Sequence, residues 1–112
     1  MQSDQLDNVF SALANPVRRD ILERLMAGSM SVGDLSQPLS ISAPAVSRHL
    51  KVLEETGLIR HEKQTQFRIY SLNPEGFTET FAYIEQYRKY WNQQFDALDR
   101  QLKARKKKHA SG

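Results

Sequence analysis

The fold of this chain is decided by residues 42–56, SAPAVSRHLKVLEET, which have the pattern of one short helix. Ser42 suits the N-cap because its side-chain oxygen can accept hydrogen bonds from the free amides of the first turn. Pro44 is tolerated in that turn because its missing N–H needs no partner there. Gly57 follows the last turn, where a helix end favours positive φ. Apolar residues recur at spacings of four and three, which predicts a narrow buried face of Val46, Leu50 and Leu53.

The other face of this helix is rich in hydrogen-bond donors. It carries Ser47, Arg48, His49 and Lys51, all able to bond phosphates or base edges. A short helix that is buried on one side and donor-rich on the other fits the major groove of DNA. An ordinary amphipathic surface helix has the same pattern, so the neighbouring segments decide between the two interpretations.

Two helices are predicted before this one, over residues 4–14 and 16–27, because both segments keep apolar side chains at helical spacing. Asn15 caps the second helix, and a proline at its first position fits the same start. Arg18 and Arg19 stand in the first turn of that helix, against the preference of the helix dipole. Contact with a DNA phosphate explains this placement, and simple solvation explains it equally well.

A third, short helix is predicted over residues 32–37, with Ser31 as its cap and Pro38 as its end. A tight connection then leads into the helix that starts after Ser42. A short helix, a brief turn and a donor-rich helix form the arrangement of a helix-turn-helix. In that arrangement the first helix braces the DNA backbone and the second enters the groove.

After Gly57 the pattern changes to that of two strands, over residues 58–64 and 67–72. An isolated two-stranded hairpin is marginal in water, so this one is expected to pack against the helices. A hairpin directly after a recognition helix is a wing, which can reach the minor groove or the adjacent phosphates. The polar residues predicted to make these contacts are Lys63, Gln64, Gln66 and Arg68.

A long terminal helix is predicted after Asn73, which is expected to cap it with Pro74 in the first turn. Its apolar residues keep a 4-3 spacing of period 3.5, broken only by Arg88, which has Tyr87 beside it. This spacing is the signature of a helix–helix seam. We call this set the terminal stripe: Phe77, Phe81, Ile84, Trp91, Phe95, Leu98 and Leu102. The helix could fold back on its own domain, but its length and period favour a dimer interface. The residues predicted for that interface are Leu6, Phe10, Trp91, Phe95, Leu98 and Leu102.

The length of 112 residues indicates one domain, predicted over residues 1–105, followed by a basic tail at 106–112 that is expected to be disordered. The net charge is +3, but five of the 16 basic residues lie in the last ten positions. The rest of the chain holds 11 basic against 13 acidic residues, so a nucleic-acid surface must be a local patch. The tail itself fits a solvated helix end better than a specific DNA contact.

Composition excludes several classes of site and predicts a cellular location. The chain has no cysteine, which excludes disulfides and thiolate metal sites. It has no apolar run as long as the roughly 18 residues of a membrane span, and no secretory signal pattern. We therefore expect a cytoplasmic protein that contacts no membrane and needs no cofactor.

The chain resembles the ArsR/SmtB family of bacterial winged-helix repressors in four segments. These are FSALANPVRRDIL at 10–22, SAPAVSRHLKVL at 42–53, GLIR at 57–60 and YSL at 70–72. The resemblance implies a mainly α fold with a small β-hairpin: a winged helix-turn-helix with a long C-terminal dimerisation helix. It also implies a homodimer that is held by the first and last helices and presents two recognition helices to an operator.

The best-known members of that family sense metals, and here the chain departs from the pattern. The family's thiolate site lies in a CVCDL run on the third helix, where this chain has SVGDL at 31–35. The second known site uses Asp, His and Glu of the terminal helices, but no histidine lies near Asp96 and Asp99. The chain is similar to the non-metal branch, so no metal is expected.

The sequence therefore predicts a DNA-binding transcriptional regulator, a repressor that acts as a homodimer on a palindromic operator of double-stranded DNA. The alternative is a winged-helix module that binds proteins without reading DNA. The donor-rich helix together with the basic wing favours DNA over that alternative. An enzyme is disfavoured because the chain lacks a Gly-rich phosphate loop, a cysteine nucleophile and a recognisable His–carboxylate motif. RNA binding is disfavoured because the strands show no motif of stacking aromatic residues.

Overall fold

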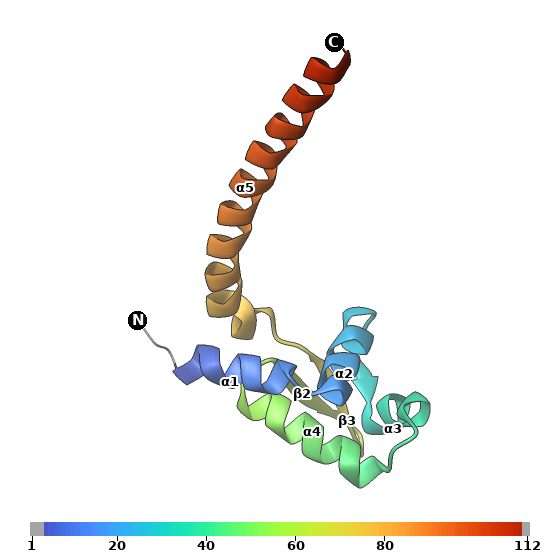
Figure 1. Cartoon of the computed structure of the whole chain (residues 1–112). Helices are drawn as coiled ribbons and strands as arrows, with labels where there is room; N and C mark the ends of the chain where they lie inside the picture. The colour runs from blue at the N-terminus through green and yellow to red at the C-terminus, as the bar shows by residue number, and fades with distance from the viewer. Residues whose placement is uncertain (1–3, 111–112) are drawn as a thin grey trace. The chain divides into compact units, whose positions relative to one another are not determined.

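The computed structural model describes residues 4–110, and the side chains up to residue 107. The chain divides between Thr80 and Phe81 into two compact units, which we describe separately. The first unit holds four helices and a small sheet, and the second consists of the long helix α5, Thr78–Ala110, from Phe81 onward (Figure 1).

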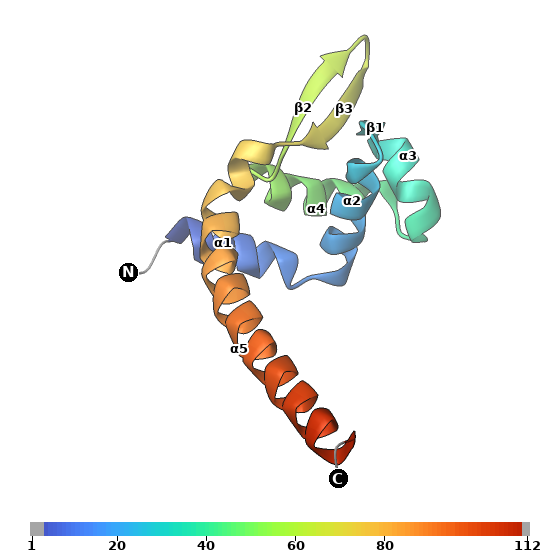
Figure 2. The same cartoon turned by 90° about the horizontal axis from the view of Figure 1, so that it is seen from above.

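The first unit contains the elements that the sequence predicted and one strand that it did not. The helices are α1 Asp4–Leu13, α2 Pro16–Met26, α3 Val32–Ser36 and α4 Ala43–Glu55, with short 3-10 turns η1 Gln37–Leu39 and η2 Pro74–Phe77. The strands are β1 Met30–Ser31, β2 Ile59–Gln64 and β3 Phe67–Leu72. The β2–β3 hairpin extends away from the helices (Figure 2).

Side-chain caps fix where these helices begin. The Asn15 side-chain oxygen accepts hydrogen bonds from the amides of Val17 and Arg18 at 2.9 and 3.2 Å. The Ser42 hydroxyl oxygen accepts from the Ala45 amide at 3.2 Å, so both predicted caps are confirmed. Ser31 also caps α3 as predicted, in a capping box that Asp34 completes.

The sheet has three strands, so the predicted two-stranded hairpin is corrected. The strand order is β1-β3-β2 with both pairs antiparallel, and β1 joins through the pairs Met30↔Tyr70 and Ser31↔Ile69. A strand of two residues is too short to give a period-2 signal, and its partner lies about 40 residues further on. The third strand supplies part of the support that an isolated hairpin lacks.

Two details near prolines also differ from the sequence predictions. Pro38 does not end the third helix directly, because the chain tightens there into the 3-10 turn η1 that contains it. Asn73 does not cap the terminal helix: its side-chain amide donates to the Gly57 carbonyl at 3.0 Å. The chain therefore forms η2 first, and α5 starts at Thr78.

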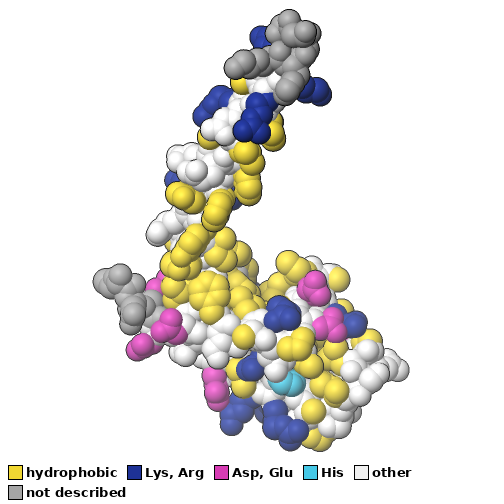
Figure 3. All heavy atoms as spheres, viewed as in Figure 1, with side chains coloured by type: hydrophobic (Ala, Val, Ile, Leu, Met, Phe, Trp, Pro, Cys, Tyr) yellow, Lys and Arg dark blue, Asp and Glu magenta, His cyan; other side chains and the backbone are white. Residues whose placement is uncertain are grey.

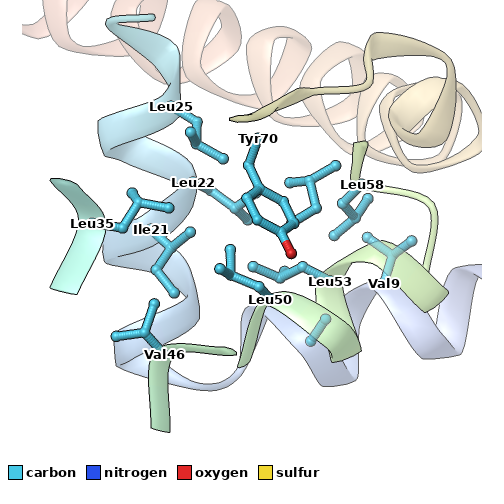
Figure 4. Packing of buried hydrophobic residues seen from close by; sticks show 12 residues of the cluster. Val9, Ile21, Leu22, Leu25, Leu35, Val46, Leu50, Leu53, Leu58 and Tyr70 are labelled. Atoms are coloured by element: carbon cyan, nitrogen blue, oxygen red, sulfur yellow. The ribbon is translucent and has the colours of Figure 1, made fainter. Parts of the chain in front are cut away.

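One apolar core holds the first unit together, and Figure 4 shows how its side chains meet. Val46, Leu50 and Leu53 of α4 are each fully buried, as their spacing predicts. Burying a side chain of this size stabilises a fold by about 1.5–3 kcal/mol. The other buried members come from α1, α2, α3, the loop after α4 and the sheet: Val9, Ala12, Ile21, Leu22, Leu25, Leu35, Leu58, Ile59 and Tyr70.

Two glycines, Gly57 and Gly76, lie where the segment after β3 packs against the end of α4. Gly57 has φ +84°, the left-handed conformation expected at a helix end. Gly76 is required by space, since a Cβ added there would lie 1.9 Å from the Gly57 carbonyl oxygen. The segment after β3 thus packs backbone to backbone against the end of α4.

The second unit exposes most of the terminal stripe. Phe81, Ile84, Trp91, Phe95, Leu98 and Leu102 are each between 45% and 63% exposed. Hydrophobic side chains line the face of α5 that Figure 3 shows. Phe77 differs from the rest of the stripe, because it lies in η2 and packs against the core of the first unit.

Helix α5 has 33 residues, which corresponds to about 50 Å of helix. It is helical through Ala110, so helical structure continues into the segment that the sequence analysis set apart as a tail at 106–112. The last two residues of that tail lie outside the described residues. Within residues 4–110, no helix combines the length and the apolar character that a membrane span requires.

Candidate nucleic-acid interface

The outer face of α4 presents donors to solvent, as the sequence predicted. Arg48 follows Val46 by two positions and precedes Leu50 by two, so a turn of 100° per residue places it opposite the buried face. Ser47 and Lys51 are exposed beside it, and so are the residues that start the helix: Ser42, Ala43 and Pro44. Figure 3 shows Lys and Arg side chains gathered where α4 lies in Figure 1.

His49 has a different position from the other predicted donors of α4. It is half-buried, on the flank of the helix and not at the centre of the outer face. The pKa of His49 is lowered by burial first, and then by the positive charges of Arg18 and Arg48. Arg18 belongs to α2, so this flank of α4 lies near the start of that helix.

Strand register places the predicted wing residues. Lys63 pairs with Arg68, so both side chains lie on one face of the hairpin, while Gln64 pairs with Phe67 on the other face. Gln66 lies in the two-residue connection between the strands. All of these side chains are exposed. The register therefore separates Lys63 and Arg68 from Gln64.

The wing is attached to α4 at its base. His61 of β2 bonds through Nδ1 to the Glu54 carboxylate of α4, and its ring centroid lies 5.4 Å from that of Tyr70. Tyr70 in turn belongs to the apolar core. This contact ties β2 to the recognition helix, which gives His61 a structural role.

A groove lies between the second half of α4 and the wing. It has a volume of about 540 Å³ and is lined by Lys51, Glu54, Glu55, Arg68 and Tyr70. The fold thus brings together Lys51 and Arg68, two predicted DNA contacts that are 17 positions apart in the chain. The two glutamates give the groove mixed charge, which disfavours phosphate at their end of it.

The family's two thiolates correspond to Ser31 and Gly33 in this chain, and Ser31 serves the fold as the N-cap of α3. Ser31 and Asp34 are held in the capping box of α3, with the Ser31 hydroxyl 3.2 Å from the Asp34 amide. Within the part of the chain that the structure describes, no three His, Asp or Glu side chains group as metal ligands would.

Comparison with known proteins identifies the family. A model described as a helix-turn-helix domain matches residues 13–62, from the end of α1 into β2. The transcriptional repressor SdpR of Bacillus subtilis is 41% identical over 68 residues, which cover 61% of this chain and 76% of SdpR. The ArsR family transcriptional regulator RHA00566 superposes with a TM-score of 0.71 at 35% identity, covering 80% of this chain and 98% of its own. The chain belongs to the ArsR family.

The ArsR fold is also found in Mb0332 of Mycobacterium bovis, described as a homodimeric winged helix-turn-helix DNA-binding domain. That structure superposes with a TM-score of 0.63 at 25% identity, covering 79% of this chain and 88% of its own. The predicted family and the mainly α winged helix-turn-helix fold are therefore confirmed. The relatives compared above are named as transcriptional regulators. The individual DNA-contacting and dimer residues remain predictions.

Proposed function

We propose that this ArsR-family chain is a sequence-specific regulator of transcription that binds double-stranded DNA as a homodimer and represses. The observation that carries the proposal is the outer face of α4, where exposed Arg48 lies opposite a fully buried apolar face. The recognition helix is thus rigidly held while its donors are free to bond DNA. The similarity to SdpR, a transcriptional repressor, supports the same function.

In this proposal the two parts of the interface have different tasks. Arg48 reads guanine through two parallel hydrogen bonds to O6 and N7 in the major groove. The first turns of α4 approach base edges with it, through Ser42, Ala43, Pro44 and Ser47. Lys51 and the wing residues Lys63, Gln64, Gln66 and Arg68 contact phosphates or the minor groove and set the position of the protein.

The homodimer is proposed to bury the terminal stripe of α5. Side chains of this size, 45% to 63% exposed along one helix, form an apolar surface that soluble monomers rarely carry. Trp91, Phe95, Leu98 and Leu102 would then meet the same residues of a second copy, and Leu6 and Phe10 of α1 are retained as candidates for the interface. A twofold dimer requires a palindromic operator whose half-sites lie about 34–36 Å apart.

Two substitutions test the proposed division of tasks. Arg48→Ala should cost about 1–3 kcal/mol on the operator and relax base preference at one position per half-site. Lys63→Ala should weaken binding to all duplexes alike and reduce the salt slope by about one unit. Binding isotherms on operator and scrambled DNA at several salt concentrations measure both effects. An equal loss on both duplexes for Arg48→Ala would make Arg48 a phosphate contact only.

We further propose that repression is independent of metal ions, since neither family site has its ligands here. Low micromolar zinc, cadmium or arsenite should leave the operator complex intact. A stoichiometric zinc titration that lowers operator affinity would reveal a missed site, and the first residues to replace would be His49, His61 and His109, the last of which has a side chain outside the described ones.

A further inference from the structure

Arg18 and Arg19 are neighbours in α2 and extend from different sides of the helix. Arg18 precedes the buried residues Ile21 and Leu22 by three and four positions, so it lies one turn above them on the same face. Arg19 lies about 100° further round the helix, and its Nη1 donates to the Leu13 carbonyl at 2.7 Å. Only Arg18 therefore extends from the face that packs on the core.

Arg18 has no counter-ion among the residues that the structure describes. Its Nε is buried and has no hydrogen-bond partner among the residues that the structure describes. The ion pairs of residues 4–107 include neither Arg18 nor Arg48. A half-buried guanidinium without a counter-ion carries a desolvation cost, which an anion from outside the protein would offset.

His49 lies close to this charge. Ile21 of α2 and Val46 of α4 lie near each other in the core (Figure 4), and His49 follows Val46 by three residues. After burial, Arg18 contributes more than Arg48 to lowering the pKa of His49, although Arg48 is its neighbour in the chain. Half-buried Arg18 and half-buried His49 thus lie on the two segments that adjoin where α2 packs on α4.

We propose that Arg18 and His49 bind one phosphodiester group of the DNA backbone at the edge of the major groove. This inference rests on the proposed DNA binding and adds α2 to the surface that contacts DNA. A helix in the groove meets bases along its centre and phosphates at its flanks. Arg48 occupies the centre of the outer face of α4, and His49 occupies the flank toward α2.

Binding should then be coupled to a proton. In free protein Arg18, Arg48 and burial disfavour the imidazolium of His49, whereas a phosphate beside the ring favours it. The pKa of His49 therefore rises when DNA binds, and the complex takes up a proton. Affinity should increase as pH falls toward and below the ordinary histidine pKa of about 6.5. His49→Gln should remove this part of the pH dependence.

The first test uses the full-length protein without DNA. The pKa of His49 is measured by NMR from its imidazole Cε1–H in the wild type, in Arg18→Gln and in the matched control Arg19→Gln. Arg18→Gln removes the repulsion and should raise the pKa, while Arg19→Gln should leave it unchanged. If Arg18→Gln does not move the pKa of His49, the two groups form no cluster and the inference is wrong.

The second test measures binding of the same variants to a labelled duplex of arbitrary sequence at low salt. Phosphate contacts are independent of sequence, so no operator is needed. Arg18→Gln should lower the salt slope by about one unit for each protomer in contact with the duplex, which corresponds to about fourfold less loss of affinity per protomer between 50 and 200 mM salt. Arg18→Lys should restore most of the slope and shows that position 18 tolerates replacement.

The outcomes of the DNA test separate the inference from the proposed function. Equal effects of Arg18→Gln and Arg19→Gln on a protein that binds DNA would overturn the phosphate site and leave DNA binding intact. A wild-type protein that binds no duplex at low salt would overturn the proposed function and, with it, the inference. The phosphate site is supported if Arg18→Gln lowers the salt slope more than Arg19→Gln does and if His49→Gln removes the pH dependence of DNA affinity.

Discussion

Helices α4 and α5 both carry apolar residues at spacings of three and four, yet the two stripes have opposite exposures. In α4, Val46, Leu50 and Leu53 are fully buried against α2 and the other core elements. In α5, Trp91 is 50% exposed and Leu98 51% exposed. The spacing of a stripe thus shows that a helix has a packing face, but not whether the partner belongs to the same chain. For α5 we propose that the partner is a second copy.

The strongest test of this contrast removes the packing face of α5. Large-to-small changes at buried sites cost about 2–5 kcal/mol each, so Trp91→Ala with Leu98→Ala should abolish dimerisation at micromolar concentration. Gln93→Ala, on the other side of the same helix, is the matched control and should change nothing. Sedimentation equilibrium measures the mass. A wild type that sediments at 12.9 kDa would refute the dimer.

A second test compares Leu50→Ala in α4 with Leu98→Ala in α5, at a protein concentration low enough for the dimer to dissociate. Leu50→Ala should still lower the free energy of unfolding by about 2–5 kcal/mol, because its partners lie in the same chain. At that concentration Leu98→Ala should change the free energy of unfolding little, because the second copy on which Leu98 is proposed to pack has dissociated. Denaturant unfolding at low protein concentration measures both. Equal losses would mean that Leu98 packs within its own protomer.

A smaller effect is expected where the chain closes against the end of α4. Gly76→Ala would place a Cβ 1.9 Å from the Gly57 carbonyl oxygen, so the backbone must shift at a cost of about 1–3 kcal/mol. Gly33→Ala is the control, since its Cβ would meet only the Ser31 hydroxyl at 3.8 Å. In thermal unfolding, Gly76→Ala should therefore have a lower melting temperature than Gly33→Ala. Equal melting temperatures would show that this approach is not tight.

Local signals account for the parts of the fold that sequence predicted well. Asn15 and Ser42 act within two or three residues of their own position, so their caps could be identified from short segments. The burial of Leu50 followed from helical spacing in the same way.

The missed features depend on contacts between distant segments. Met30 pairs with Tyr70 across 40 positions, and a strand of two residues is too short for its sequence to predict that pairing. Asn73 donates to the Gly57 carbonyl instead of capping the next helix, a choice that only the folded chain determines. The proposed cluster of Arg18 and His49 likewise depends on how α2 packs on α4. The local signals for Arg18 were its place in the first turn of α2, against the helix dipole, and its position three residues before a core isoleucine.

Selection of bound duplexes from a random DNA pool tests the central claim most directly, because it asks whether the protein binds DNA and which bases it reads. We expect enriched sequences with two inverted half-sites about 10–10.5 base pairs apart, centre to centre, and a guanine in each half that Arg48→Ala no longer selects. A pool that stays random after repeated rounds at low salt would contradict the account and favour a winged helix that binds protein instead.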